Sequence, residues 1–326
     1  MSNNKHSKEG FLKRFYNSYI PNKRDSVGQI LIKLLFIICL VALIVSAAVL
    51  IDYYVEAHRQ EEMAEQSRDI WYSESQDITS TPDSGNSTES NAETVIDTRG
   101  PTQKLIDENN DFIGWIRIKN TKVNYPVYQT DNNDYYLTHN QQKKRSAYGA
   151  IYIDCENTVT SEKIDKNLVI YGHEMKNGSM FGTLKKLRSL DFYKQNPTID
   201  FSTLFSDGTY KIYSVFVLNA DKVDDGGKIY NIYRKEFYGE KDFNEWHAES
   251  LERSVINTNV DVVYGDDIIT LVTCCDDFEN ARLVVMARKT REGEASSVDT
   301  SSATLNENPR YPMQWYLDRG IEPTFE

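Results

Sequence analysis

An uncharged apolar run near the N-terminus constrains this chain more than any other feature. Leu34–Ile51 contains 18 residues without a charged side chain. The apolar residues Ile30–Ile32 extend the run past Lys33, whose long side chain can reach the bilayer surface. A helix of this length can cross a hydrocarbon core of roughly 30 Å. We therefore expect a single transmembrane anchor over residues 30–51.

The charges that flank this run indicate its orientation. Residues 1–33 hold seven of the 37 Lys and Arg residues but only two of the 49 acidic ones, and an acidic stretch follows the run. Because basic flanks stay on the cytoplasmic side, we expect a cytoplasmic tail over residues 1–29 and an extracellular remainder. A cleaved signal peptide with Ser46–Ala48 as its cleavage site is the alternative, but its apolar region is usually only about 7–15 residues long.

The part of the chain beyond residue 33 is acidic and poor in cysteine. It carries 30 basic and 47 acidic residues, a balance that argues against nucleic acid or an anionic membrane surface as a partner. Cys39 lies in the apolar run, which leaves Cys155, Cys274 and Cys275 outside. Three cysteines do not make a disulfide framework. An exposed thiol is then best explained by reactivity, whereas Cys155 fits a buried structural residue better.

Composition divides the extracellular part into three. Residues 52–102 begin with helix-forming residues and become rich in Ser and Thr, which predicts a helical extension followed by a flexible linker. Residues 103–290 alternate apolar runs with turn residues and predict one mainly β domain, an eight-stranded barrel with a few flanking helices. Residues 291–326 begin rich in Ser and end rich in aromatic residues, so we expect a C-terminal tail that is partly docked on the barrel.

The expected strands and helices follow from the period of the apolar residues. The strands are Phe112–Ile118, Lys122–Tyr128, Gly149–Asp154, Asn167–Tyr171, Thr198–Ser202, Tyr210–Asn219, Asp267–Thr273 and Arg282–Arg288. The helices are Lys104–Asn109, Ser179–Leu190 and Asp242–Ile256.

Cys274 stands where an apolar strand ends and its side chains meet solvent. A cysteine reacts as the thiolate, so a nearby group must favour or generate the negative charge. A polar eight-residue step leads from Cys274 to Arg282 and predicts a loop that returns the chain beside the first strand. The forked donors of Arg282 could then hold an oxyanion. Taken alone, Arg282 fits a surface strand residue in a salt bridge better.

His173 is the best acid–base candidate among the five histidines. It follows the apolar run Leu168–Ile170 and leads into a glycine-containing loop, and a histidine at such a strand exit can donate and accept protons. His139 and His247 fit a polar turn and a packed helix better. Without its context, His173 would also fit a structural role.

The spacing of the candidate ligand residues matches no metal or cofactor site. His173–Asn177 (HEMKN) begins like a zincin helix, but Asn177 replaces the second histidine and Gly178 breaks the helix. The aspartates Asp221, Asp224 and Asp225 lack the spacing of a calcium loop. We therefore expect no metal and no cofactor.

Several of these segments together resemble the sortase family, class B, over roughly residues 103–290. The segments are Thr270–Cys274 (TLVTC) with Arg282, Tyr171–His173 (YGH) with Gly178–Gly182 (GSMFG), Gly114–Ile116, Asn124–Val127, Asp134–Leu137 and the helix at 242–256. They occur in the order typical of the family. Cys275 departs from its pattern, because a second thiol directly after the nucleophile position is unusual. Alternation along a strand points neighbouring side chains to opposite faces, so Cys274 remains the expected nucleophile.

The resemblance implies a cysteine transpeptidase of the Gram-positive cell surface that needs no cofactor. Cys274 would attack the carbonyl of a Thr in a C-terminal sorting signal, and Arg282 would stabilise the oxyanion. Thr273 and Thr270 are the expected substrate and oxyanion support. His173 would protonate the leaving amine. An amino group of a peptidoglycan precursor would then take the acyl group and anchor the surface protein to the wall.

Two other outcomes stay open for the same resemblance. The enzyme could use water to release proteins, or could link pilin subunits through Lys, because the shape of the groove selects the acceptor. A barrel that only binds its partner without catalysis is the third hypothesis, and the complete set of Cys274, His173 and Arg282 disfavours it. Neither the exact sorting motif nor the amine acceptor can be read from the residues.

Overall fold

The computed structural model describes residue 16 and residues 18–73, 100–221 and 229–323. Most of the predicted basic tail and of the predicted Ser/Thr-rich linker lies outside these residues. The chain divides into two compact units, Met1–Glu62 and Met63–Glu326.

The long apolar run forms part of one helix, α2 (Val27–Tyr72, 46 residues). Its residues carry no proline and no internal glycine beyond Gly28, so nothing in the sequence interrupts the backbone hydrogen bonds. Its apolar window is long enough to cross a membrane, and none of that window is buried by the rest of the protein. Lys33 near its start forms an ion pair with Asp25 at 2.8 Å. These features are consistent with a single-pass membrane anchor.

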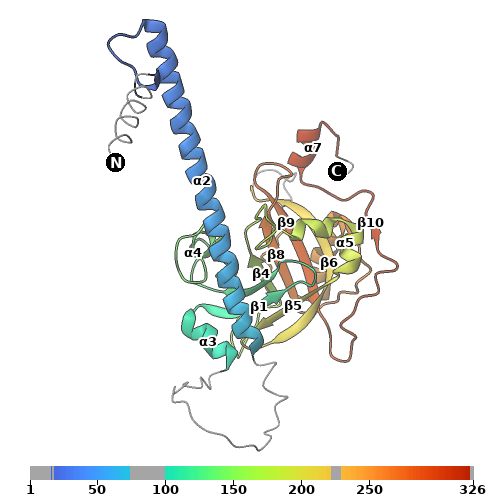
Figure 1. The fold of residues 1–326 in the computed structure, drawn as a ribbon. Helices are drawn as coiled ribbons and strands as arrows, with labels where there is room; N and C mark the ends of the chain where they lie inside the picture. The colour runs from blue at the N-terminus through green and yellow to red at the C-terminus, as the bar shows by residue number, and fades with distance from the viewer. Residues whose placement is uncertain (1–15, 17, 74–99, 222–228, 324–326) are drawn as a thin grey trace, which may run out of the picture. The chain divides into compact units, whose positions relative to one another are not determined.

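The second unit is built on a closed eight-stranded barrel, which confirms the predicted fold (Figure 1). Neighbouring strands follow the order β1-β2-β3-β4-β8-β9-β6-β5. Their bounds are β1 Phe112–Arg117, β2 Asn124–Tyr128, β3 Ile151–Ile153, β4 Asn167–Tyr171, β5 Thr198–Thr203, β6 Asp207–Asn219, β8 Ile268–Cys274 and β9 Ala281–Lys289. Each predicted strand matches one of these, with ends that differ by a few residues.

Parallel pairing of β4 with β8 brings together two segments about one hundred residues apart. Asn167 is the partner of Ile268, and Tyr171 is the partner of Val272. On its other side β8 pairs antiparallel with β9, from Ile268 opposite Arg288 to Cys274 opposite Arg282. The apolar residues of β4, β8 and β9 are almost fully buried. Burial of this kind explains why these strands read as continuous apolar runs.

Helices cover the barrel at a few places, and most of them are short. They are α3 (Pro101–Glu108), α4 (Tyr135–Thr138), the 3₁₀ helix η2 (Leu184–Arg188), α5 (Leu190–Gln195), α6 (Glu240–Arg253) and α7 (Met313–Arg319). A separate two-stranded sheet pairs β7 (Ile256–Asn257) with β10 (Thr304–Leu305). The last turns of α2 also pack on β1, where Trp71 stacks on Trp115 with ring centroids 5.1 Å apart.

The expected helix over Ser179–Leu190 is wrong. The chain there forms turns, then η2, and the α-helix α5 begins only at Leu190. Met180 has a φ of 51°, which an α-helix does not allow. A side chain on Gly182 would lie 2.2 Å from the carbonyl oxygen of Met175, so the backbone is folded tightly on itself. The apolar spacing of Leu184 and Leu187 reflects burial of a 3₁₀ turn.

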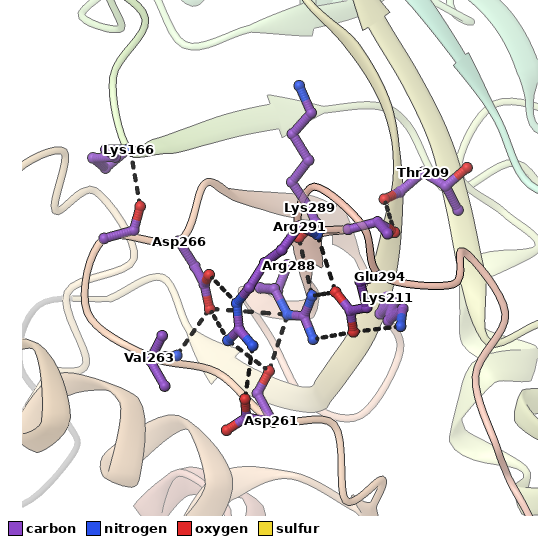
Figure 2. A network of polar contacts seen from close by, with 12 residues as sticks. Lys166, Thr209, Lys211, Asp261, Val263, Asp266, Arg288, Lys289, Arg291 and Glu294 are labelled. Atoms are coloured by element: carbon purple, nitrogen blue, oxygen red, sulfur yellow. Dashed lines mark hydrogen bonds and ion pairs between the residues drawn. The ribbon is translucent and has the colours of Figure 1, made fainter.

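A network of charged side chains lies near the first residues of β8 and the last residues of β9 (Figure 2). Arg288 is only 1% exposed and forms an ion pair with Glu294. Arg291 binds Asp266 at 2.7 Å and Asp261 at 2.8 Å. A buried charge is tolerated only when it is paired, and Glu294 supplies the paired charge for Arg288. Because Glu294 belongs to the start of the C-terminal tail and Arg288 to β9, this ion pair attaches the tail to the barrel.

We expect Glu294→Gln to lower the free energy of unfolding at pH 7 by about 2 kcal/mol, because the buried Arg288 loses a charged hydrogen-bond partner. Hydrogen bonds from Arg288 hold the pKa of Glu294 below its usual value. The carboxylate therefore stabilises the fold fully above its unfolded pKa of about 4.3, and this contribution decreases as the pH falls below that value. Urea unfolding at several pH values should show the gap between wild type and variant shrinking below pH 4.3. An equal gap at all pH values would contradict this assignment.

Candidate active site

Cys274 is the last residue of β8 and lies at the rim of the barrel. The six residues before it are buried, and Cys274 itself is exposed. The β-branched and leucine residues of Ile268–Val272 explain the strand, because they fit a buried pleated surface. The strand therefore presents one thiol to solvent at its end.

Arg282 lies directly opposite Cys274 in the pairing of β8 with β9. Directly opposed residues of an antiparallel pair point to the same face and have Cα atoms roughly 4.5–5.5 Å apart. The Arg282 guanidinium donates to the carbonyl oxygen of Ala281 at 3.0 Å. Within the described part of the chain, no carboxylate lies within ion-pair distance of it. Arg282 thus keeps donors for another acceptor, which argues against the surface salt bridge.

His173 reaches the same place from β4. The parallel register pairs Tyr171 with Val272, and the Gly172 amide donates to the Val272 carbonyl at 3.3 Å. Two further residues on each strand lead to His173 and Cys274. Adjacent strands are only about 4.8 Å apart, so register places the imidazole and the thiol on neighbouring strand ends.

A backbone carbonyl holds the His173 ring. Its Nε2 lies 2.7 Å from the carbonyl oxygen of Leu137, at the end of α4. A carbonyl oxygen can only accept a hydrogen bond, so Nε2 carries the proton. In the neutral ring Nδ1 is then the atom that can accept a proton. This contact gives the two ring nitrogens different roles: Nε2 holds the ring in place, and Nδ1 can accept a proton.

Gly149 supports the same histidine through its lack of a side chain. Its φ is +59°, and a Cβ there would lie 2.3 Å from the Tyr136 carbonyl oxygen and 3.1 Å from Cδ2 of His173. The sequence marked this residue only as the start of a strand.

We expect Gly149→Ala to lower kcat about 10- to 100-fold, because the new methyl group would lie 3.1 Å from both the His173 ring and the Leu137 carbonyl oxygen that orients it, and would displace them. The rate of the acyl transfer expected from the sequence would be the measurement. Gly265→Ala is the matched control, since Gly265 also has a positive φ (+98°) but has nothing within 4 Å of its added Cβ. Equal activity of the two variants would contradict this role of Gly149.

The three side chains line one pocket of about 540 Å³. Its walls are mostly apolar or aromatic and come from the ends of β4, β6, β8 and β9, from Leu137 and from residues 229–233. Leu137, Ile229 and Tyr233 are 40%, 43% and 52% exposed, respectively. An open, largely apolar pocket with a few convergent polar groups is typical of a binding site for an extended ligand.

Hydrogen bonds from buried side chains hold the 229–233 wall of the pocket in place. Asn167 donates to the carbonyl oxygen of Ile232 at 2.8 Å, and Trp246 of α6 donates to that of Asn231 at 2.8 Å. The Thr270 hydroxyl donates to Asn167 Oδ1 at 2.7 Å. Thr270 has no exposed surface and is not one of the residues that line the pocket. The Thr270 side chain therefore reaches the pocket wall only through Asn167, in contrast to the expected direct role in substrate support.

Thr273 differs from Thr270 in its position relative to the pocket and in its hydrogen bonding. It lines the pocket, and its buried hydroxyl finds no hydrogen-bond partner among the described residues. A buried hydroxyl without a partner is costly, so a group that enters the pocket could satisfy it.

Cys275 faces a different environment from Cys274. It is half-buried and packs against a cluster formed by Val217, Phe278 and Ala281. Burial, together with Asp277, raises the pKa of Cys275 to about 12. At neutral pH this thiol is protonated and a poor nucleophile, which favours Cys274 as the reactive cysteine.

Comparison with known proteins identifies the family of this chain. A family model described as the sortase domain matches residues 116–290. Sortase B of Listeria monocytogenes is 36% identical over 188 residues, which cover 57% of this chain and 71% of that protein. The chain therefore belongs to the sortase family of cysteine transpeptidases, and within it to class B.

Solved structures give the same answer for the fold. Sortase B of Clostridium perfringens superposes with a TM-score of 0.52 at 32% identity, over 58% of this chain and 99% of that one. Sortase B of Bacillus anthracis, in complex with AAEK1, has a TM-score of 0.58 at 26% identity and covers 73% of this chain and 100% of that one.

Among the described residues, no group of three or more His, Cys, Asp or Glu side chains could hold a metal ion. A thiol, an imidazole and a guanidinium lie together in the lining of one pocket.

Proposed function

We propose that this chain is a membrane-anchored transpeptidase that cleaves a C-terminal sorting signal after Thr and transfers the acyl group to an amine of the cell wall. One observation carries the proposal: Cys274, His173 and Arg282, from three neighbouring strand ends, line the same pocket. Acyl transfer needs a nucleophile, a proton carrier and an oxyanion donor. These three side chains supply one of each.

In the first half-reaction, the Cys274 sulfur attacks the Thr carbonyl carbon of the sorting signal. Its proton passes to Nδ1 of His173, because Nε2 already donates to Leu137. The Arg282 guanidinium stabilises the oxyanion, with support from the Thr273 hydroxyl. When the tetrahedral intermediate collapses, the C–N bond breaks and His173 returns the proton to the leaving amine. A thioester on Cys274 remains.

In the second half-reaction, an amine attacks the thioester. His173 takes a proton from the incoming nitrogen, Arg282 again stabilises the oxyanion, and the C–S bond breaks. Cys274 recovers its proton, and a new amide joins the surface protein to the acceptor. A peptidoglycan precursor supplies the amine in this proposal.

The location of the enzyme follows from α2 and the charges around it. The helix is apolar and exposed over a span that could cross a bilayer, and the basic residues precede that span. By the rule that basic flanks remain inside, the N-terminus is cytoplasmic and the barrel is extracellular. Its partners are then the lipid bilayer, sorting-signal proteins and a cell-wall amine.

Trapping the acyl enzyme tests this function directly. The full chain in detergent would be incubated with a library of sorting peptides, with and without amine acceptors, and analysed by mass spectrometry. We expect a thioester adduct on Cys274 and an amide product when a suitable amine is present. Release to water with every amine would identify a hydrolase, and a Lys-linked pilin product would identify a polymerase. No adduct with any peptide would refute the proposal.

A further inference from the structure

The C-terminal tail lies beyond the region matched by the sortase domain, which ends at residue 290, yet it contacts the barrel repeatedly. Its first part is fastened by Glu294 to Arg288. Thr304 and Leu305 then pair with β7, and the Arg310 amide donates to the carbonyl oxygen of Glu252 at 2.9 Å. Figure 1 shows this segment in red, passing β10 before it forms α7.

The last part of the tail packs against residues 275–280, the loop between Cys274 and the start of β9. We call this segment the nucleophile loop. Phe278 of this loop is buried in a cluster with Val217 and Ala281, and Trp315 and Tyr311 pack against that cluster. The Tyr311 and Trp315 rings stack with centroids 4.0 Å apart and planes 7° from parallel. Stacked aromatic rings make a large and rigid contact.

Asp277 is the second attachment of the nucleophile loop. Its carboxylate accepts two hydrogen bonds from Arg188, at 2.8 and 2.9 Å, and its side chain is only 6% exposed. Its carbonyl oxygen accepts from Arg319 of α7 at 3.4 Å. The Arg319 guanidinium also lies over the Trp315 ring, 4.3 Å from the centroid. The loop is therefore held by η2 on one side and by the tail on the other.

Without the tail, Phe278 would keep only Val217 and Ala281 of this cluster as its apolar support. Asp276, Glu279 and Asn280 are exposed and polar, and loops of this kind open easily. Any shift of the loop moves the last residue of β8 and the first residues of β9, because Cys274 and Arg282 lie at its two ends.

We propose that residues 303–321 act as a positioning clamp on the nucleophile loop, with Trp315 as the principal contact, and thereby keep Cys274 and Arg282 aligned for acyl transfer. This inference rests on the proposed function, since it assigns the clamp to that reaction. Trp315, Tyr311 and Arg319 are positioning residues, because they touch the loop. None of the described residues lining the pocket belongs to the tail.

The clamp also covers Cys275. This thiol packs against the same cluster as Trp315, and its burial keeps it away from reagents. Loss of the Trp315 ring should open this side of the loop. The accessibility of Cys275 therefore reports on the clamp independently of catalysis.

The experiment compares the full chain with Trp315→Ala, Trp315→Phe and Leu317→Ala. Leu317 is the matched control, since it lies on the same helix but is 62% exposed. We expect Trp315→Ala to lower kcat about tenfold with KM unchanged, because catalytic groups tolerate small displacements poorly. The pocket that binds the peptide stays intact, so KM is not affected. Trp315→Phe should restore most of kcat, and Leu317→Ala should match the wild type.

A second measurement follows alkylation of Cys275 by iodoacetamide in a Cys274→Ala background, with peptide mapping. Adding Trp315→Ala should accelerate this alkylation about tenfold, and Trp315→Phe should not. If Trp315→Ala unfolds at the assay temperature, Arg319→Gln replaces it, with an expected loss of kcat of about threefold. Unchanged kcat and unchanged alkylation in the folded variants would overturn the clamp.

The two proposals fail in different ways. A wild-type chain that forms no acyl adduct refutes the transpeptidase function, while the alkylation of Cys275 still decides whether the tail shields the loop. A wild-type chain that transfers acyl groups, together with a Trp315→Ala variant of equal kcat, refutes the clamp alone.

Discussion

Replacing Cys274 by alanine is expected to abolish acyl transfer, with a loss of kcat of about 10⁴-fold or more, because the covalent step has no other nucleophile. The exposed thiol at the end of β8 is the only one that lines the pocket among the described residues. Peptide cleavage and thioester formation would be measured separately, by fluorescence and by mass spectrometry.

Cys275→Ala is the matched control for this experiment. The Cys275 thiol is half-buried on the other side of the loop, and its raised pKa keeps it protonated. We expect this variant to keep its kcat within about threefold, since a small cavity near a loop shifts the site only slightly. Transfer that survives in Cys274→Ala and disappears in Cys275→Ala would reverse the assignment of the nucleophile.

Arg282→Ala should lower kcat about 10²- to 10³-fold, which is the usual effect of removing one oxyanion donor. KM should change little, since the donor acts on charge that develops only in the transition state. Arg282→Lys tests whether charge alone suffices. A lysine keeps the charge but lacks the planar fork, so we expect it to stay within about tenfold of the alanine variant.

Thermal unfolding of both Arg282 variants provides the control. Within the described part of the chain, Arg282 makes no ion pair and donates only to the neighbouring Ala281 carbonyl, so its loss should leave Tm nearly unchanged. A Tm that falls as steeply as kcat would mean that Arg282 supports the strand rather than the reaction.

The barrel could be predicted because its strands are apolar throughout or alternate in polarity, and both patterns survive in the structure. The helix predicted at Ser179–Leu190 failed for a local reason. Met180 has a positive φ, and the backbone packs tightly at Gly182. Neither backbone feature changes the spacing of the apolar residues, so the sequence pattern does not reveal them. The two-stranded sheet of β7 and β10 has only two residues in each strand, too few for any pattern.

Those parts of the candidate site that are reactive side chains could be predicted from the sequence. The parts that are backbone groups could not. Cys274, Arg282 and His173 each follow or begin an apolar run, which a reader of the sequence can see. The carbonyl that holds His173 belongs to Leu137, and any residue could supply it. The Asn167 that braces the pocket wall is the first residue of β4, and its amide carried no functional signal in the sequence.

The parallel pairing of β4 with β8 has a consequence for how this enzyme comes into being. Asn167 and Ile268 meet across about one hundred residues of intervening chain, and such distant partners join late because loop closure opposes them. The thiol thus meets its imidazole only when the domain is nearly complete. A newly made polypeptide would lack the paired thiol and imidazole until its last strands had formed.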